Sequence, residues 1–242
     1  MATYLQLCQE VHRLVRSGNN APGSAPTTVT SQTLLNSEIP VWVNRAWIEI
    51  QQSKKEWSFL IQRKSSLALS SGSSTVNFAN IDSNFAWVVP FNTDGPPYIL
   101  IYADADGVAT QSKCYYMPYE SFAGYHDRGT LPTAKPLYFT QQPDRYLKFN
   151  ATADQAYTLT LDIRLEADSL TADSDSPSNY PDTDEGLLPE FHDVIMWRAV
   201  QMYCATRADM GPLYQMAEQQ YRRIYKLMVD RYLPDPTVDL RY

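Results

Sequence analysis

The chain is divided by its hydrophobic periodicity, which is helical at both ends and strand-like between them. Residues 3–17 and 34–57 carry apolar side chains three or four positions apart, and residues 188–206 and 213–232 repeat this pattern. Between residues 59 and 165, short β-rich runs are separated by turn residues such as Asp-Gly and Ser-Gly. We therefore expect helices from the two ends to pack together around an inserted β segment.

These periodicities predict an α+β fold class. We expect a four-helix bundle built from the N- and C-terminal segments, with an inserted antiparallel β domain, either a small sheet or a sandwich, and an extended C-terminal arm. The expected parts are a helical pair at 1–57, the β domain at 58–166, an acidic loop at 167–186, a second helical pair at 187–233 and the arm at 234–242.

Particular residues support this arrangement. Trp47 and Trp197 lie on apolar stripes that a single partner helix cannot cover, so the front and back helices are expected to meet. Pro40 is expected either to kink the second helix or to mark its first turn. Trp42 falls off the main stripe of the same helix, which is compatible with a contact to a neighbour.

The composition limits the function classes. The chain has 242 residues with 44% hydrophobic content, enough for a substantial core, and its 17 Tyr against 8 Phe suit surfaces that become buried in interfaces. A formal net charge of −7 argues against binding nucleic acid through its phosphates, although not against a surface that DNA moves past. We find neither a signal peptide nor an apolar run long enough to span a membrane, so synthesis and folding in cytoplasm and no membrane partner are expected.

No residue pattern indicates catalysis. Cys8, Cys114 and Cys204 are far apart and odd in number, which favours small buried hydrophobes in a reducing compartment over disulfides or a metal site. The three histidines, His12, His126 and His192, fall on separate elements, and no phosphate-binding or dinucleotide-binding glycine pattern occurs. We therefore expect no catalytic residues, no cofactor and no metal.

Two further segments are distinctive. Residues 166–185 contain seven acidic residues and no basic one, which is typical of a solvated loop, and their spacing does not fit a calcium-binding loop. Residues 233–242 contain two prolines and then apolar residues at alternate places. This ending is either a frayed terminus or a docking arm.

Several of these segments together resemble one known family. They are residues 3–10 (TYLQLCQE), the Gly/Ser/Pro/Thr linker after them, residues 41–51 (VWVNRAWIEIQ) in a helix ending at Trp57, and residues 188–199 (LPEFHDVIMWRA). In their order and spacing they resemble the head-to-tail adaptor, or connector, family of tailed bacteriophages, as in short-tailed phages. The resemblance implies a helical bundle with an inserted β domain, a ring of about twelve copies below the portal protein of the capsid, and C-terminal tails that dock into the portal.

The function implied by the resemblance is that of a structural virion protein. The chain would be one protomer of a ring-shaped adaptor at the head-tail junction, joining the capsid portal to the tail and forming part of the DNA exit channel. Its expected partners are other copies of itself, the portal protein, a tail or nozzle protein, and double-stranded DNA that passes without specific binding. Synthesis would take place in the cytoplasm of the bacterial host.

Two sets of contact residues are expected on this interpretation. The portal-docking arm would use Leu233, Val238, Leu240, Arg241 and Tyr242. A contact with the tail, or with the channel, would use Asp173, Asp175, Tyr180, Asp182 and Asp184.

Two alternatives from other classes remain open. The first is a tail-associated cell-wall hydrolase, in which Glu120 and Asp127 would be the pair of carboxylates that glycoside hydrolysis needs. The second is a carbohydrate-binding module built on the β segment, in which exposed Tyr and Trp rings would stack on sugars.

Overall fold

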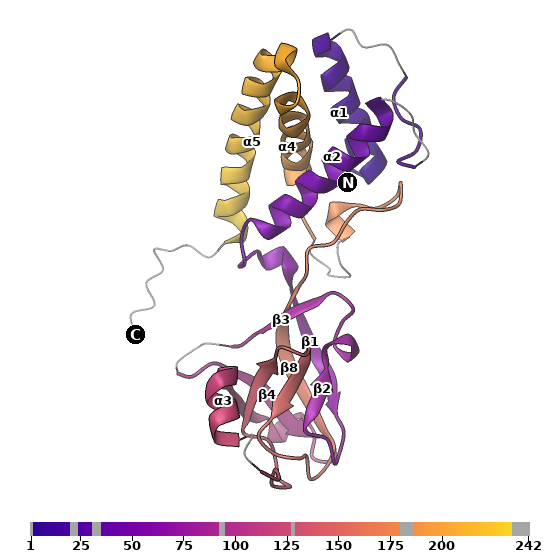
Figure 1. The fold of residues 1–242 in the computed structure, drawn as a ribbon. Helices are drawn as coiled ribbons and strands as arrows, with labels where there is room; N and C mark the ends of the chain where they lie inside the picture. The colour runs from indigo at the N-terminus through magenta and orange to yellow at the C-terminus, as the bar shows by residue number, and fades with distance from the viewer. Residues whose placement is uncertain are drawn as a thin grey trace. The chain divides into compact units, whose positions relative to one another are not determined.

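A computed structural model of the chain describes residues 2–19, 24–30, 35–91, 95–126, 129–179 and 186–233. The described residues form two compact units (Figure 1). One unit comprises the described residues up to Leu60 together with those from Ala167 onward, and the other comprises Ile61–Glu166. We call them the helical unit and the barrel unit.

The helical unit contains four of the five α-helices that the described residues form. They are α1 (Tyr4–Asn19), α2 (Leu35–Gln52), α4 (His192–Ala205) and α5 (Gly211–Tyr232). Its short 3-10 turns are η1 (Ser58–Leu60), η4 (Pro177–Asn179), η5 (Pro189–Phe191) and η6 (Ala208–Met210). Helix α4 packs against each of the other three helices, which makes it the centre of this unit (Figure 1).

Aromatic and aliphatic side chains fill the core around α4. Trp47 is fully buried, and its ring stacks on that of Phe59 with centroids 6.1 Å apart. Trp57 is buried as well, and its Nε1 donates to the carbonyl oxygen of Ile50 at 2.8 Å. Helix α2 therefore ends at Gln52, earlier than its apolar pattern predicts, because the chain turns back after it and inserts Trp57 into the core.

Pro40 lies inside α2, where it leaves one backbone carbonyl of the preceding turn without its helical N–H donor. The hydroxyl of Tyr4 on α1 donates to the carbonyl oxygen of Pro40 itself at 2.7 Å, which ties α1 to α2 at this point. The proline therefore lies within the helix and does not mark its first turn.

The barrel unit is an eight-stranded sheet. Its strands are β1 (Ile61–Leu69), β2 (Thr75–Asn77), β3 (Phe85–Val89), β4 (Tyr98–Ala103), β5 (Ser112–Tyr116), β6 (Tyr138–Gln142), β7 (Tyr146–Phe149) and β8 (Tyr157–Leu165). The 3-10 turns η2 (Phe78–Asn80) and η3 (Val108–Thr110) and the helix α3 (Tyr119–His126) connect them. The strand order is β1-β8-β4-β5-β6-β7-β2, and β3 pairs with the part of β8 that β4 leaves uncovered.

The expected fold class is wrong. The described residues do not form a four-helix bundle with a small inserted antiparallel sheet or sandwich: they form five α-helices and a single eight-stranded sheet that nearly closes into a barrel. The sheet is mixed, because β5 and β6 pair in parallel. Parallel neighbours need a crossover, and the segment that supplies it carries α3.

Strand β8 organises the barrel. Tyr157, Leu159, Leu161, Ile163 and Leu165 alternate along it and are all buried, so the predicted half-buried strand is confirmed. Its two edges together pair with β1, β3 and β4. The inward residues of β4 and β5, among them Ile99, Ile101 and Cys114, complete the same core.

Candidate interaction surfaces

A row of aromatic rings crosses the outside of the barrel unit. Tyr98 on β4 pairs directly with Tyr115 on β5, which pairs with Tyr138 on β6. Ring centroids along the row are 5.7 Å apart for Phe91 and Tyr98, 6.5 Å for Tyr98 and Tyr115, 6.2 Å for Tyr115 and Tyr138, and 5.8 Å for Tyr138 and His126. Because Ile99, Cys114 and Phe139 face the core, strand alternation places these rings on the outer surface.

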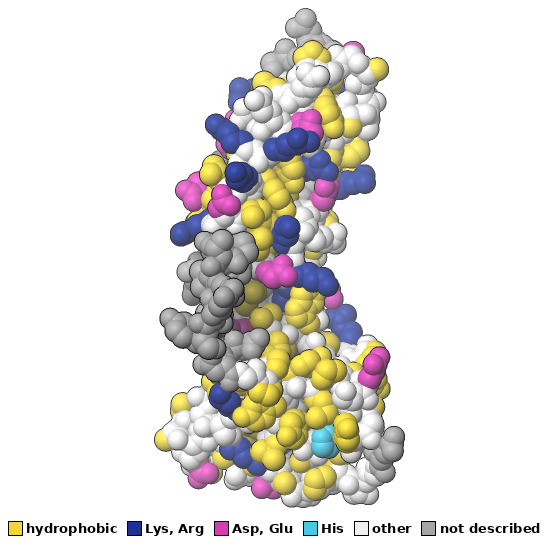
Figure 2. Space-filling model, turned by 90° about the vertical axis from the view of Figure 1, so that its left-hand side faces the viewer, with side chains coloured by type: hydrophobic (Ala, Val, Ile, Leu, Met, Phe, Trp, Pro, Cys, Tyr) yellow, Lys and Arg dark blue, Asp and Glu magenta, His cyan; other side chains and the backbone are white. Residues whose placement is uncertain are grey.

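Cations and exposed apolar residues extend this aromatic row. Lys113 Nζ lies 4.2 Å above the Tyr98 ring, and the guanidinium of Arg63 lies 5.2 Å above the Phe91 ring. The exposed large side chains around α3 and the start of β6 are Tyr119, Tyr125, Leu137 and Tyr138. Figure 2 shows hydrophobic side chains gathered over one face of the barrel unit, with a histidine among them. A patch of this kind is typical of a contact surface.

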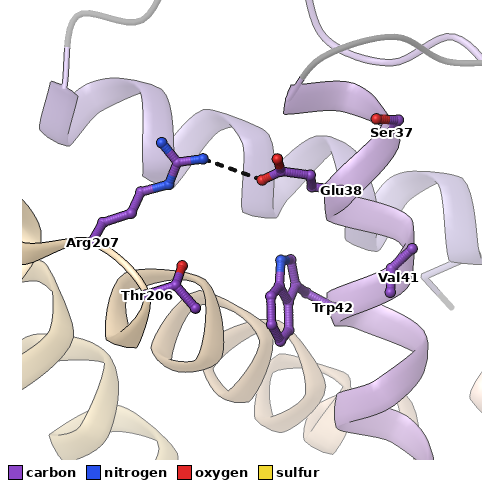
Figure 3. A pocket seen from close by; sticks show the side chains of 6 residues that line it. All are labelled: Ser37, Glu38, Val41, Trp42, Thr206 and Arg207. Carbon is purple, nitrogen blue, oxygen red and sulfur yellow. Dashed lines mark hydrogen bonds and ion pairs between the residues drawn. The ribbon is translucent and has the colours of Figure 1, made fainter.

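In the helical unit, a pocket of about 510 Å³ lies between the first turns of α2 and the end of α4. Its lining residues are Ser37, Glu38, Val41, Trp42, Thr206 and Arg207. Figure 3 shows the Trp42 ring pointing from α2 toward Thr206, beside the ion pair of Glu38 with Arg207. That pair joins Arg207 Nη2 to Glu38 Oε2 at 3.2 Å.

Two of the lining residues, Arg207 and Trp42, make cation–π contacts with neighbouring side chains. The Arg207 guanidinium lies 4.4 Å above the ring of Tyr203, one turn earlier on α4, and the Arg45 guanidinium lies 5.7 Å from the Trp42 ring. These contacts fix both arginines by their planar faces. The Val41 side chain at the rim is 62% exposed, which is unusual for a β-branched apolar residue.

Helix α5 presents a second exposed apolar site in the helical unit. Its buried side carries Ala217, Ile224 and Met228. Met216 and Leu227 are exposed instead, and their separation of eleven residues is about three helical turns, so both lie on one outward stripe. Among the described residues of the helical unit, the exposed large hydrophobic side chains are these two and Val41.

The acidic segment is partly built into the helical unit. The Asp173 carboxylate accepts from the backbone N–H of Val29 at 2.6 Å and from the Thr28 hydroxyl at 3.1 Å. The Asp175 carboxylate accepts from the backbone N–H groups of Thr171 at 2.6 Å and Ala172 at 2.7 Å. Burial alone would raise the pKa of Asp175, but these hydrogen bonds lower it overall. Both carboxylates therefore bind backbone groups of their own chain.

The other expected contact residues fall largely outside the described part of the chain. Tyr180, Asp182 and Asp184 of the expected tail or channel contact lie outside it, and so do Val238, Leu240, Arg241 and Tyr242 of the expected portal-docking arm. Leu233, the first residue of that arm, is described and packs against the core of the helical unit. The sequence did not predict the pocket, for which the position of Trp42 off the main stripe was the one signal.

The residues considered for chemistry do not converge. His12 is buried on α1, His192 is buried at the start of α4, and His126 packs between Phe122 and Tyr138 in the barrel unit. Within the described ranges, no group of three or more His, Cys, Asp or Glu side chains is arranged to hold a metal ion. Glu120 lies on α3, whereas Asp127 falls outside the described residues. Cys8, Cys114 and Cys204 are free and buried.

The comparison with protein families decides the identity of the chain. The family model described as "SU10 adaptor protein" matches residues 2–239, which is nearly the whole sequence. The chain belongs to the SU10 adaptor protein family. No curated protein matches the sequence.

This SU10 adaptor family member is a phage adaptor protein, and therefore a structural component of the virion that contacts other virion proteins. Membership in this family indicates a structural protein. The described part of the chain contains no helix with the length and apolar character needed to cross a membrane. Because a phage adaptor contacts other virion proteins, the exposed apolar sites of the two units are interpreted as protein contact surfaces.

Proposed function

We propose that the chain is one protomer of a ring-shaped head-to-tail adaptor that joins the capsid portal to the tail. The observation that carries this proposal is the position of the exposed apolar residues of the helical unit. Val41 lies on α2, whereas Met216 and Leu227 lie on α5, and α4 packs between these two helices (Figure 1). A subunit of a closed ring needs two different contact faces, one for each neighbour.

The ring would consist of about twelve copies, as the resemblance to head-to-tail adaptors implies. It would lie at the head-tail junction, after assembly in the host cytoplasm, and would line part of the DNA exit channel. The net charge of −7 per chain supports a wall that DNA passes without specific binding, because it repels the phosphate backbone. A tail or nozzle protein would attach on the side opposite the portal.

The arm that begins at Leu233 is proposed to dock into the portal. Leu233 is anchored on the helical core, so any docking segment after it starts from a fixed point. Burying Val238, Leu240 and Tyr242 in a partner would contribute roughly 1.5–3 kcal/mol each before ordering costs. Arg241 would add a charged contact at the rim of that interface.

The experiment is cosedimentation of the full-length chain with assembled portal. Deletion of residues 234–242 is expected to abolish cosedimentation and to leave the melting temperature unchanged. A second variant keeps the arm length but replaces Val238, Leu240 and Tyr242 with Ser. It should lose portal binding to the same extent if the apolar side chains make the contact. Unchanged cosedimentation of either variant would contradict the docking role, and electron micrographs of the wild-type complex without a ring would contradict the adaptor assembly.

The carbohydrate-binding alternative has one observation in its favour, the aromatic row on the barrel unit. Its ring planes are inclined by 69° between Tyr98 and Tyr115 and by 41° between Tyr115 and Tyr138. Rings inclined in this way do not form a flat platform for successive sugar faces. Tilted Tyr rings with adjacent cations suit a protein contact better.

A further inference from the structure

The pocket on the helical unit combines an apolar floor with a polar rim. Trp42 and the methyl group of Thr206 form the floor, and the Glu38–Arg207 ion pair lies beside them (Figure 3). A ligand for this pocket therefore needs one slender apolar group flanked by groups that can both donate and accept hydrogen bonds. It needs no net charge, because the ionised groups of the rim already neutralise each other.

The outward stripe of α5 offers these groups in one place. Met216 is 42% exposed, and Gln219 and Gln220 follow it by three and four residues, on the same face of the helix. A methionine side chain is flexible, and its sulfur makes favourable contacts with aromatic rings such as that of Trp42. The glutamine amides can accept from Arg207 and donate to Glu38.

Position along the helices favours Met216 over Leu227 as the inserted residue. Only residues 206–210 separate α4 from α5, so the start of α5 lies at the same end of the helical unit as Thr206 and Arg207. Met216 is about 8 Å along α5 from its first residue, and Leu227 is about 16 Å farther on. In a ring whose axis runs parallel to these helices, rotation about the axis relates one copy to the next and leaves every residue at the same position along the axis. Contacts between neighbouring copies therefore join residues at similar positions along it.

We propose that Met216 of one copy inserts into the Trp42 pocket of the next copy, so that α5 of each protomer packs against α2 and α4 of its neighbour. This inference rests on the proposed ring and names the two halves of its subunit interface. In its own copy Met216 does not line the pocket. The contact is heterologous, joining two different surfaces, which is the type of contact that closes into a ring.

Disulfide trapping in assembled particles tests this contact. The double variant Val41→Cys with Met216→Cys is expected to give a ladder of covalent multimers of the chain on a non-reducing gel after mild oxidation, because each ring contact would join one new thiol to the other. Each single variant should stay monomeric on the same gel, and mixing the two single variants should give dimers and no larger species. The native cysteines are buried, so they should contribute no background.

The matched control is Val41→Cys with Leu227→Cys, which places the second thiol on the same stripe about three turns away and should not form a ladder. Absence of a ladder in the Val41/Met216 double variant, from particles that contain the ring, would overturn the proposal. So would dimers of the Met216→Cys single variant, since they would show that α5 packs against α5. If micrographs of wild-type particles show no ring of this chain, the proposed function itself is wrong. The micrographs therefore distinguish a failure of the proposed ring from a failure of the Met216 contact within it. All three positions are exposed, and unchanged melting of each purified variant confirms folding.

Discussion

The carboxylate of Asp173 accepts a hydrogen bond from the backbone N–H of Val29, a residue 144 positions earlier in the chain, at 2.6 Å. The same segment binds α1, because the carbonyl oxygens of Asp175 and Asp173 accept from the backbone N–H groups of Tyr4 at 2.6 Å and Leu5 at 3.3 Å. These N–H groups belong to the first turn of a helix, where no helical acceptor exists. The segment after β8 therefore caps α1 and holds the loop that precedes α2.

Asp173→Ala is expected to lower the free energy of unfolding by about 1–3 kcal/mol, because it leaves the Val29 N–H and the Thr28 hydroxyl without their acceptor. Asp173→Asn is the matched control. It keeps an acceptor oxygen of the same size and should cost less than half as much. Urea denaturation followed by circular dichroism measures both. Equal stability of the Ala variant and the wild type would show that the contact contributes nothing.

Neutralising Asp182 and Asp184 together to Asn tests the proposed contact of the acidic segment without disturbing the internal bonds of Asp173 and Asp175. We expect loss of tail attachment with normal DNA retention, because Tyr180 beside these charges offers an aromatic anchor for a basic tail protein. Slowed DNA ejection from complete particles would indicate a channel position instead. Particles normal in both respects would exclude both roles.

Trp47→Ala is expected to destabilise the chain by about 3–5 kcal/mol, because this fully buried ring stacks on Phe59 and its removal leaves a cavity. Val41→Ala serves as the comparison. Its side chain is exposed, so its effect on the purified chain should stay within about 0.5 kcal/mol. Chemical denaturation curves measure the stability of both variants. Similar midpoints would mean that Trp47 is not a core residue.

The free energy of unfolding of the chain should decrease as the pH drops below about 6.5. Burial lowers the pKa of His192, and burial together with the charge of Arg16 lowers that of His12, relative to a reference near 6.5. The unfolded chain then binds more protons than the folded chain as the pH drops through 6.5, so the stabilisation present above that value is lost progressively.

For His192 burial is the main cause of the lowered pKa, and the contacts of the ring fit its neutral form. The Nδ1 atom accepts from the backbone N–H of Ala2 at 3.2 Å, which leaves Nε2 to donate toward the carbonyl oxygen of Leu187 at 3.1 Å. Only a neutral ring can make both bonds. His192→Gln should weaken the dependence of unfolding free energy on pH between 7.5 and 5.5, and an unchanged slope would exclude His192 as its source.

The thiols should be unreactive in the folded chain. Burial raises the pKa of Cys8 to about 12 and that of Cys204 to about 11, and it raises the pKa of Cys114 as well. A thiol reagent at pH 8 is expected to detect no cysteine rapidly in the native chain and all three after denaturation. Rapid labelling of any native cysteine would show that its element opens readily.

The helices could be predicted from the sequence because their apolar stripes are local. The periodic segments 3–17 and 213–232 correspond closely to α1 (Tyr4–Asn19) and α5 (Gly211–Tyr232). The fold class could not be predicted, because it depends on pairings between distant residues. Strand alternation is the same in a sandwich and in a barrel, and nothing local indicates that β5 and β6 run in parallel.

The contact surfaces were less predictable than the helices. A segment with seven acidic residues and no basic one is typical of a solvated loop. The carboxylates of Asp173 and Asp175 nevertheless accept hydrogen bonds from backbone N–H groups, and amino-acid composition does not predict such contacts. The pocket depends on the ion pair between Glu38 and Arg207, which are 169 positions apart. In the sequence, Trp42 differs from its neighbours only in lying off the apolar stripe of its helix. Nothing in the sequence distinguishes Met216, whose exposure depends on the tertiary structure.

The barrel unit begins and ends at neighbouring points, because Ile61 at the start of β1 pairs with Arg164 near the end of β8. A domain whose two ends lie side by side is well tolerated as an insertion in another chain. We therefore expect a shorter loop or an unrelated module with adjacent ends to fit the same two attachment points. Alteration or replacement of the barrel would then leave the helical unit, with its capping segment and its pocket, with the same architecture.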